Sequence, residues 1–312
     1  MSSPLPRDSF INTIFQAAKL DKEIIFLCAD LGAQALDEFR AQLPHQFIHL
    51  GISEQNMIDV AAGLAIDGKK VFCYAMAPFV TLRPFEQIKV ALAHMNLPVT
   101  LIGVGVGFAY DDAGPTHYAT EDIACMRSLA GIEILTPADD TSVVQMAKLC
   151  LEKPMLRYIR LDRKNLPEVY DGKSIFNNDG VNLISEGKER ALVASGYMLH
   201  TALEVKKRLN EKGQNFAVLD LFKIKKIPDS FLTMMKPYKK VYTLEEHFLS
   251  GGFGSAVLEY CEEKNLAQKV KRIGVEDHYY FENGGRKYIH KLAQIDVDSV
   301  LDRILKDLCD EI

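Results

Sequence analysis

Short runs of β-branched and aromatic residues alternate with longer amphipathic stretches along most of this chain, as in proteins whose parallel sheet is wrapped by helices. The apolar runs predict six strands in the first half, at 23–31, 46–51, 69–76, 98–107, 132–138 and 155–161. A helical period of apolar residues predicts helices at 54–68, 84–96 and 140–153. Ser53 is a residue type that caps helix starts, so we expect it to cap the first of these helices.

The alternation pauses over residues 164–187, which are polar and rich in turn-forming residues. It then resumes, predicting strands at 190–197, 216–222, 239–247 and 269–277 and helices at 198–213 and 251–265. We therefore expect two consecutive three-layer α/β/α domains with mostly parallel sheets, over residues 1–170 and 188–312. Residues 171–187 are predicted to be the linker between them.

Composition and charge narrow the class of protein. The net charge of −5 argues against a surface for nucleic acid or anionic membranes. No apolar run reaches the roughly 18 residues of a membrane span, and the N-terminus lacks the layout of a secretory signal. Six scattered cysteines without a CxxC pair favour buried free thiols and a cytoplasmic location. No HExxH motif occurs, and no metal site is predicted on this chain.

Glu54 is the first candidate for chemistry, because it begins a predicted helix directly after the strand at 46–51. A glutamate at a helix start is usually just a favourable partner for the helix dipole. However, α/β proteins bind ligands at this edge of the sheet, and the helix that follows is apolar rather than solvated. A carboxylate buried there can share a proton with a ligand nitrogen.

His117 is the second candidate. It follows the chain-breaking pair Gly114 and Pro115 in a loop between a strand and a helix, for which Thr120 is the expected N-cap. A histidine held beside such a turn is suited to acid–base chemistry near neutral pH. An ordinary surface histidine is the alternative.

Three arginines, Arg157, Arg160 and Arg163, lie near the end of the strand at 155–161. Strand alternation points Arg157 and Arg163 to one face and Arg160 to the other. Arginine suits bidentate recognition of phosphate, although a solvated sheet edge is an equally good explanation. The glycines of 103–114 form neither GxGxxG before a helix nor GxxxxGK[ST], so no nucleotide-binding loop is predicted.

Taken together, these segments resemble the pyrimidine-binding domain of transketolases, followed by the C-terminal domain of that family. Five motifs carry the resemblance, in order and with sensible spacing: LGISEQNM (50–57), CYAMAPFVTLRPFEQI (73–88), GPTHYATEDIACMRSL (114–129), RLDRKNLP (160–167) and TLEEHFLSGGFGSAVLEY (243–260). The resemblance covers nearly the whole chain and implies an enzyme that uses thiamine diphosphate.

The resemblance implies roles at the cofactor. Glu54 matches the catalytic glutamate that hydrogen-bonds N1′ of the aminopyrimidine and thereby activates the cofactor. Phe79 best matches the aromatic residue that stacks on the pyrimidine, with Tyr74 and Phe85 as alternatives because the alignment can shift by one residue. Asp30 matches an aspartate close to the cofactor.

The resemblance also implies roles at the substrate. His117 matches the catalytic histidine that contacts the hydroxyl or carbonyl oxygens of the sugar. Arg163 matches an arginine that holds the sugar phosphate, and Arg7 matches a second one near the N-terminus.

Three departures from the family pattern affect the substrate end. Ala113 stands where an acidic residue usually precedes GPTH, and Asp112, one position earlier, is the candidate substitute. Gln34 replaces a serine that helps to hold phosphate. The strand before GPTH lacks its usual histidine. The cofactor end therefore looks intact, while the identity of donor and acceptor sugars, and their phosphorylation, stays open.

Full-length family members begin with a domain that holds the diphosphate through a metal bound by a GDG motif and a later asparagine, and no GDG occurs here. We therefore expect this chain to be one subunit of a split transketolase in carbohydrate metabolism. A separate chain would supply the diphosphate contacts and Mg²⁺ or Ca²⁺, in an α2β2 heterotetramer.

Three other functions compete with this one. The β subunit of a 2-oxoacid dehydrogenase's decarboxylating component shares the architecture and the glutamate, but it needs no sugar-phosphate arginine. A 1-deoxyxylulose-5-phosphate synthase has a similar GPTH loop, but it is normally one chain. A non-catalytic paralogue is disfavoured because Glu54, His117 and Arg163 are all present.

Overall fold

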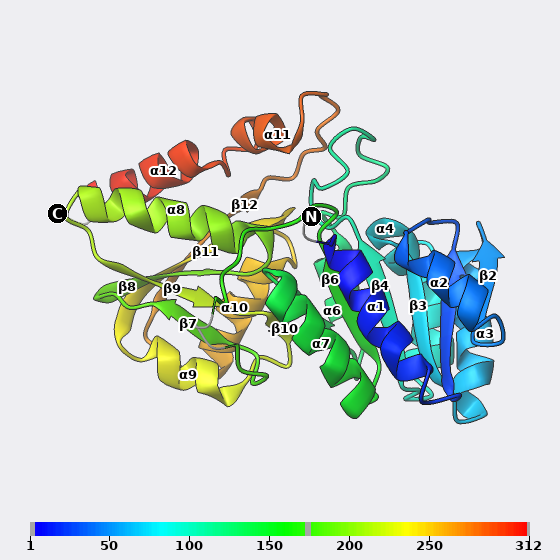
Figure 1. Ribbon diagram of the computed structural model, residues 1–312. Helices are drawn as coiled ribbons and strands as arrows, with labels where there is room; N and C mark the ends of the chain where they lie inside the picture. The colour runs from blue at the N-terminus through cyan, green and yellow to red at the C-terminus, as the bar shows by residue number, and fades with distance from the viewer. Residues whose placement is uncertain (1–3, 172–175, 311–312) are drawn as a thin grey trace.

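The chain forms two sheets, each covered by helices on both faces, in the computed structural model, which describes residues 4–171 and 176–310 (Figure 1). The first sheet has seven strands in the order β10-β5-β6-β4-β3-β1-β2, and the second has five in the order β12-β11-β8-β9-β7. All strand pairs are parallel except β10 with β5 and β7 with β9. The prediction of two α/β/α units with mostly parallel sheets is confirmed.

The strands of the first sheet are β1 (Ile24–Ala29), β2 (Phe47–Gly51), β3 (Lys70–Met76), β4 (Val99–Val104), β5 (Glu133–Leu135), β6 (Arg157–Leu161) and β10 (Lys223–Lys225). One face is covered by α1 (Pro6–Ala18), α2 (Ala35–Gln42) and α7 (Asp140–Glu152). The other face is covered by α3 (Glu54–Ile66), α4 (Ala77–Thr81), α5 (Phe85–Gln87), η1 (Ile88–Ala93) and α6 (Asp122–Arg127).

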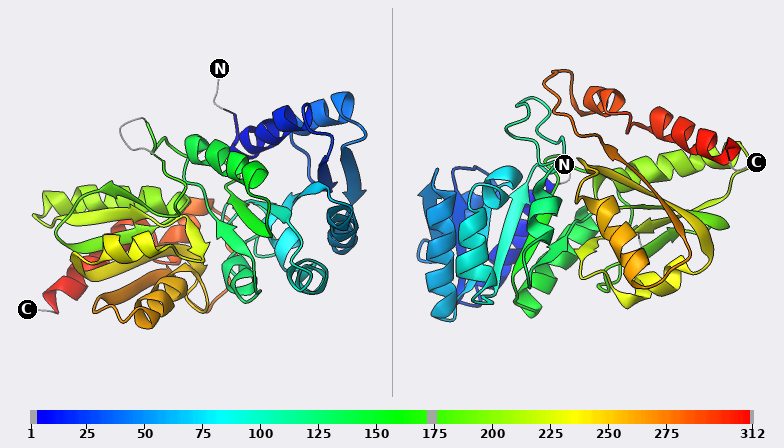
Figure 2. Two further views of the ribbon diagram at one scale, coloured as in Figure 1. Left: turned by 90° about the horizontal axis from the view of Figure 1, so that it is seen from below. Right: turned by 180° about the vertical axis from the view of Figure 1, so that it is seen from behind.

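The strands of the second sheet are β7 (Asn182–Ser185), β8 (Glu189–Ala194), β9 (Phe216–Asp220), β11 (Tyr238–Phe248) and β12 (Lys269–Val275). One face is covered by α8 (Tyr197–Glu211), α11 (Arg286–Leu292) and α12 (Val297–Cys309). The other is covered by α9 (Asp229–Met235) and α10 (Phe253–Glu263). The two units lie side by side (Figure 2), and one apolar cluster runs continuously from the α3 face of the first sheet to α9 and α10.

Two short strands were not predicted. β7 lies inside the stretch expected to be a linker, 171–187, and it adds antiparallel to the edge of the second sheet. β10 comes from the second half of the sequence, yet it pairs with β5 at the edge of the first sheet. Both strands are only three or four residues long, which is too short for an alternating pattern to stand out.

Local structure differs from the predictions around three helix starts. Ser53 occupies the N-cap position of α3, but its hydroxyl donates to the carbonyl of Leu50 instead of capping the helix. Glu121, not Thr120, precedes α6. The helix expected at 84–96 is one α-turn followed by the π-helix η1, in which the side chains of Ile88 and Leu92 are buried.

The structure also bears on the predictions of buried free cysteines and of no membrane span. All six cysteines are free, and burial is confirmed for Cys28, Cys73, Cys150 and Cys261. Cys125 is half-buried and Cys309 is exposed. Within residues 4–171 and 176–310, no helix is long and apolar enough to cross a membrane.

Candidate functional site

The candidate residues follow the carboxyl ends of the parallel strands of the first sheet. Glu54 follows β2, Phe79 follows β3, His117 follows β4 and Arg163 follows β6. The chain runs from β1 outward to β2 and returns to the other side of β1 with β3. Open α/β sheets bind ligands at such a reversal of strand order, outside the carboxyl ends. The fold therefore collects these residues at its usual ligand-binding edge.

Glu54 is buried at the start of α3, with 3% of its surface exposed. Its Oε2 accepts a hydrogen bond of 2.6 Å from Nη1 of Arg83, whose side chain is 38% exposed. Arg83 lies in the segment between α4 and α5, which packs against α3. The charge of the buried carboxylate is therefore neutralised from the rim of the site.

A row of rings and guanidinium groups extends from Glu54 to Arg163. The Arg83 guanidinium carbon lies 4.2 Å from the ring centroid of Phe79. The ring of Phe79 lies edge-on, 5.2 Å from that of His117, which in turn lies 6.0 Å from Tyr110. These contacts join the expected cofactor residues to the expected substrate residues.

The far end of the row carries Arg163 and Asp112. The Arg163 guanidinium lies 4.5 Å from the ring centroid of Tyr110, and Arg163 also forms an ion pair with Asp112 at 2.5 Å. This hydrogen bond holds the pKa of the Asp112 carboxyl below its usual value. Burial raises the pKa of the Tyr110 phenol, while the charges of Arg163 and Arg7 oppose that shift.

His117 is half-buried, and its Nδ1 lies 2.9 Å from the hydroxyl of Thr116. Its backbone N–H donates to the carbonyl of Gly114, which closes the turn at the GPTH motif. The histidine ring thus stands between Phe79 and Tyr110 with one nitrogen already engaged.

Sequence reasoning missed Arg83 and Tyr110. Both lie inside or beside motifs that were recognised, Arg83 in TLRPF and Tyr110 directly before the two aspartates. Arg83 could have been noticed because it lies only four residues after the candidate aromatic Phe79. No local signal marks Tyr110, because its importance comes from the groups around it.

The other cofactor candidates lie in different settings. Tyr74 is 0% exposed, and its ring packs 6.0 Å from that of Phe26 in the core beneath α1 and α2. Phe85 is half-buried and packs against the core next to α3. Asp30 is exposed directly after β1. Among the aromatic candidates, Phe79 is the one whose ring contacts both Arg83 and His117.

Arg157 and Arg160 are buried, which excludes the solvated sheet edge considered as an alternative for them. Arg157 pairs with Glu133 at 2.5 Å, and Arg160 pairs with Asp122 at 2.8 Å. Arg157 also donates to the carbonyl of Lys153 at the end of α7, whereas Asp122 belongs to α6 on the opposite face. The two arginines thus point to opposite faces, as alternation predicts, but they are structural rather than available to a ligand.

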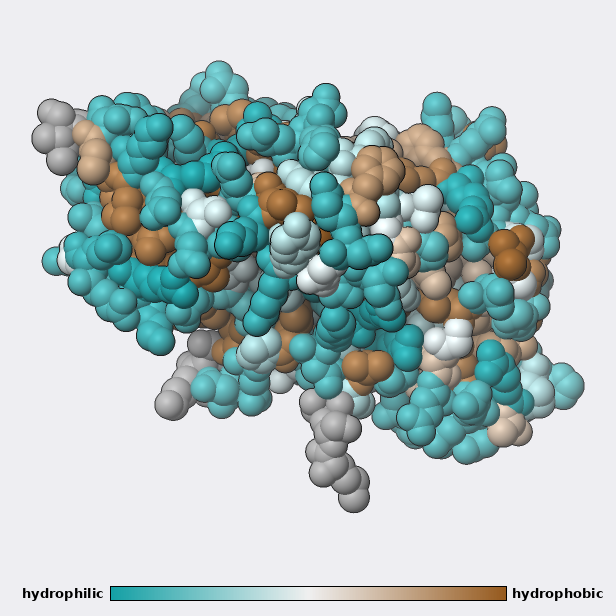
Figure 3. Space-filling model, turned by 90° about the horizontal axis from the view of Figure 1, so that it is seen from above, coloured by the Kyte–Doolittle hydropathy of each residue, from teal (hydrophilic) through white to brown (hydrophobic). Residues whose placement is uncertain are grey.

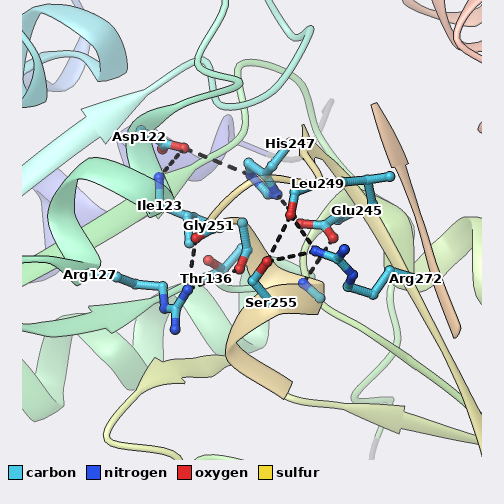
Figure 4. Close-up of polar contacts among 12 residues, drawn as sticks. Asp122, Ile123, Arg127, Thr136, Glu245, His247, Leu249, Gly251, Ser255 and Arg272 are labelled. Carbon is cyan, nitrogen blue, oxygen red and sulfur yellow. Dashed lines mark hydrogen bonds and ion pairs between the residues drawn. The ribbon is translucent and has the colours of Figure 1, made fainter. Parts of the chain in front are cut away.

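Asp122, the partner of Arg160, also meets His247 of the second domain, with 3.8 Å between its Oδ1 and Nε2 of His247 (Figure 4). Nη2 of Arg160 lies 2.6 Å from Nε2 of His247, which comes from β11 of the second sheet. Burial opposes ionisation of Asp122, but the charges of Arg160 and His247 outweigh it and lower the pKa of that carboxyl. Nearby, Arg127 donates to the carbonyl of Gly251 at 2.8 Å.

The glycines of the 103–107 segment make room for side chains rather than phosphate. Gly105 has φ +83°, and a Cβ there would stand 2.0 Å from the Tyr110 ring. Gly107 has φ +57°, and a Cβ there would overlap the carboxylate of Glu246 from the second domain. Glycine is required at both positions by conformation and by space.

Two family models match the chain. The model described as "Transketolase, pyrimidine binding domain" matches residues 6–169, and that described as "Transketolase, C-terminal domain" matches residues 179–300. The chain therefore belongs to the transketolase family of thiamine-diphosphate-dependent transferases, and the resemblance seen in the sequence is confirmed.

Several relatives are themselves subunits or sections of a transketolase. A subunit of the apulose-4-phosphate transketolase of Phocaeicola vulgatus is 34% identical over 274 residues, 87% of each chain. The putative transketolase C-terminal section of Methanocaldococcus jannaschii is 28% identical over 97% of this chain and 96% of its own length. A solved structure described as a split-gene transketolase, inactive β4 tetramer, is 30% identical, with a TM-score of 0.85 over 98% of both chains.

A second group of relatives carries another name. The 1-deoxy-D-xylulose-5-phosphate synthase of Microcystis aeruginosa is 32% identical over 274 residues. That match covers 86% of this chain but only 43% of the relative.

Proposed function

We propose that this chain is the pyrimidine-binding subunit of a two-chain transketolase that transfers a two-carbon ketol unit between sugar phosphates. The observation that carries the proposal is the continuous row of contacts from buried Glu54, through Arg83, Phe79, His117 and Tyr110, to Arg163. Such a row places a cofactor-activating carboxylate, an acid–base group and a phosphate-binding group along one edge.

The cofactor end fits an aminopyrimidine. Glu54 is a buried hydrogen-bond acceptor at a helix start, suited to hold the protonated ring nitrogen N1′. The half-buried ring of Phe79, one step away through Arg83, offers a surface on which the pyrimidine would stack. When bound, thiamine diphosphate supplies the carbanion chemistry of ketol transfer. The chain's own task is to hold the ring and to exchange a proton at its N1′.

The substrate end fits a phosphorylated sugar. His117, between Phe79 and Tyr110, would exchange protons with the hydroxyl or carbonyl oxygens of the sugar. Arg163 and Arg7 would hold its phosphate, which suits the planar, permanently charged guanidinium group. Asp112 pairs with Arg163 and would have to share that guanidinium with the phosphate. The two arginines favour a sugar phosphate over the 2-oxoacid of a dehydrogenase component.

A separate chain would complete the site. Relatives named as a transketolase subunit and as a transketolase C-terminal section support this arrangement. Exposed apolar side chains stand next to both members of the Glu54–Arg83 pair in the sequence: Ile52 (75% exposed) near Glu54 and Leu82 beside Arg83. We expect this face to contact the partner, which would supply the diphosphate contacts and Mg²⁺ or Ca²⁺ in an α2β2 assembly. Free cysteines suit a reducing cytoplasm.

The test is reconstitution. Mixed with a candidate partner chain that carries a GDG motif, thiamine diphosphate and Mg²⁺, the protein should transfer a ketol group from a ketose phosphate to an aldose phosphate. A panel of phosphorylated and unphosphorylated ketoses would identify the donor. Ketol transfer by this chain alone would overturn the two-chain proposal, and its absence with every partner and donor would overturn the reaction.

The match to 1-deoxyxylulose-5-phosphate synthases supports a second candidate. The same reconstituted pair should therefore be assayed for formation of 1-deoxyxylulose 5-phosphate. Formation of that product without ketol transfer would replace the transketolase proposal.

A further inference from the structure

The sequence neighbours of Asp112 and Arg163 both form hydrogen bonds with one residue of the second domain. Asp111, beside Asp112 in sequence, accepts a 2.9 Å hydrogen bond from the backbone N–H of Arg286 at the start of α11. Asp162, beside Arg163, accepts a 2.7 Å hydrogen bond from Nη1 of the same Arg286. Both segments that carry the ion pair are thus held by a single residue, which lies more than 120 positions further along the chain.

Arg286 is itself held rigidly by the second domain. It is 6% exposed, its Nε donates to Glu246 on β11 at 2.7 Å, and its guanidinium lies 3.7 Å from the ring centroid of Tyr197 on α8. His290, one turn further along α11, binds the same Glu246 carboxylate. Burial opposes the charge of Arg286, but Asp162 and Glu246 outweigh it and raise the pKa of the guanidinium.

The loop that contains Asp112 meets the second domain at the same place. The carboxylate of Glu246 occupies the space beside Gly107 where a Cβ would stand. Lys164, next to Arg163, donates to the Asp111 carboxylate at 3.0 Å. Figure 1 shows this loop and the segment leading into α11 rising next to each other above the two sheets, and hydrophilic side chains dominate that upper face in Figure 3.

We propose that Arg286 is a positioning residue through which the second domain sets the geometry of the phosphate-binding end. It holds Asp111 and Asp162, and thereby fixes where Arg163 and Asp112 stand relative to each other. The inference rests on the proposed function for the role of Arg163. The second domain contributes no side chain to the row of contacts described above, and this inference gives it the role of positioning Arg163 and Asp112.

Asp111 provides the sharper test, because removing the buried Arg286 would leave Glu246 and Asp162 unpaired and could prevent folding. Charge alone would make Asp111→Ala improve phosphate binding, since it removes a negative charge beside an anion site. If Asp111 instead positions the phosphate-binding groups, Asp111→Ala should weaken phosphate binding. We expect Asp111→Ala to raise KM for the phosphorylated ketose about 10-fold, because small misplacements of binding groups are costly. The kcat and the KM for an unphosphorylated ketose should change little.

Two further variants separate positioning from other effects. Asp111→Asn keeps an oxygen that can accept from the N–H of Arg286, so it should recover most of the lost affinity. In an Arg163→Gln background, Asp111→Ala should cause no further rise in KM, because residues that act through one another are not additive.

Arg127→Gln is the matched control. Arg127 also joins the two domains, through Gly251 and Glu259, but on α6 rather than beside Asp112 (Figure 4). It should leave KM at the wild-type value. An unchanged or lower KM in Asp111→Ala, or the same rise in Arg127→Gln, would overturn the proposal.

Hydrogen exchange distinguishes failure of this inference from failure of the proposed function. If the wild-type pair shows no ketol transfer, the proposed function fails, but the attachment of the loop can still be measured. Backbone amides of residues 109–117 should exchange faster in Asp111→Ala than in the wild type and in Arg127→Gln. Equal exchange in all three proteins would overturn the positioning role without any reference to activity.

Discussion

Arg83, in the turn between α4 and α5, donates a hydrogen bond of 2.6 Å to Glu54, the first residue of α3 on the same face of the first sheet. The carboxylate is almost wholly buried, whereas the guanidinium reaches the surface and lies over Phe79. A ligand nitrogen that binds Glu54 must therefore share the carboxylate with Arg83 or displace it. Arg83 thus controls access to the group on which the proposed chemistry depends.

Replacing Glu54 tests the proposed activation of the cofactor. In the reconstituted pair, Glu54→Gln should lower kcat for ketol transfer by about 100-fold or more, since it removes a positioned acid–base group. Initial rates with saturating ketose phosphate would measure this. Glu86→Gln, at an exposed position within α5, serves as the control and should keep the wild-type rate. Full activity in Glu54→Gln would contradict the role assigned to Glu54.

Replacing Arg83 tests the ion pair. Arg83→Gln leaves a buried carboxylate without its cation and should lower the free energy of unfolding. Because Arg83 is 38% exposed, solvent weakens the pair, and we expect a loss of about 1 kcal/mol. Urea denaturation of the isolated chain would measure it. Arg40→Gln breaks an exposed pair with Asp37 and should lower the free energy of unfolding by less. Equal losses in the two variants would contradict a contribution from the burial of Glu54.

Replacing the two arginines tests the phosphate end. Arg163→Gln and Arg7→Gln should each raise KM for a phosphorylated ketose about 10- to 100-fold, the effect of losing a charge-assisted hydrogen bond. The KM for an unphosphorylated analogue should stay unchanged. Arg208→Gln, in an exposed pair with Asp298 on the second domain, is the control. Equal effects on both sugars would show that these arginines do not bind phosphate.

Asp220 gives a prediction about pH. Burial raises the pKa of its carboxyl from 3.8 to about 7, although a hydrogen bond from Tyr170 opposes the shift. The native state therefore keeps a proton that the unfolded chain releases, so the contribution of Asp220 to the free energy of unfolding should fall as pH rises from about 4 to about 7 and then level off. Each pKa unit corresponds to about 1.4 kcal/mol.

Asp220→Asn should flatten this slope and stabilise the protein at pH 8 relative to the wild type. Guanidinium denaturation at pH 5 and pH 8 would measure both effects. Asp67→Asn, at an exposed position after α3, should retain the wild-type slope. A difference in the free energy of unfolding between the wild type and Asp220→Asn that stays the same at pH 5 and pH 8 would contradict a raised pKa for Asp220.

Gly105 links backbone conformation to the substrate end. Gly105→Ala should destabilise the fold by about 1–3 kcal/mol for its positive φ alone, and it should also displace the ring of Tyr110, on which Arg163 rests. Gly213 has a similar φ of +73° with open space around it, so Gly213→Ala isolates the backbone cost. Thermal unfolding would compare the two variants. Only Gly105→Ala should raise KM for the phosphorylated sugar. Similar KM values in the two variants would contradict a role for Tyr110 in the site.

The succession of the longer strands along the chain and the positions of α3, α7, α8 and α10 followed from apolar periodicity, because long amphipathic segments carry their own pattern. Helices α1, α2, α4, α9, α11 and α12 were not predicted. The apolar helix that follows Glu54 allowed a buried carboxylate there, but an ordinary helix-start glutamate was the alternative, and the fold decided between them. β7 and β10 could not be predicted, because a strand of three or four residues gains its hydrogen bonds from a neighbouring edge and not from its own pattern. Arg157 and Arg160 were ambiguous because buried pairing depends on acidic partners from β5 and α6.

The sequence by itself determined the class of fold, the family and the order of the candidate groups along the chain, since periodicity and motifs are local properties. Only the tertiary structure decided which groups meet. Arg83 reaches Glu54 across 29 positions, and Arg286 reaches Asp162 across 124. Such pairs depend on strand order and on how two sheets pack, which bring distant segments to one edge. Glu54, a helix-start carboxylate in the sequence, thus acquires in the fold a cationic partner and a place at one end of a connected site.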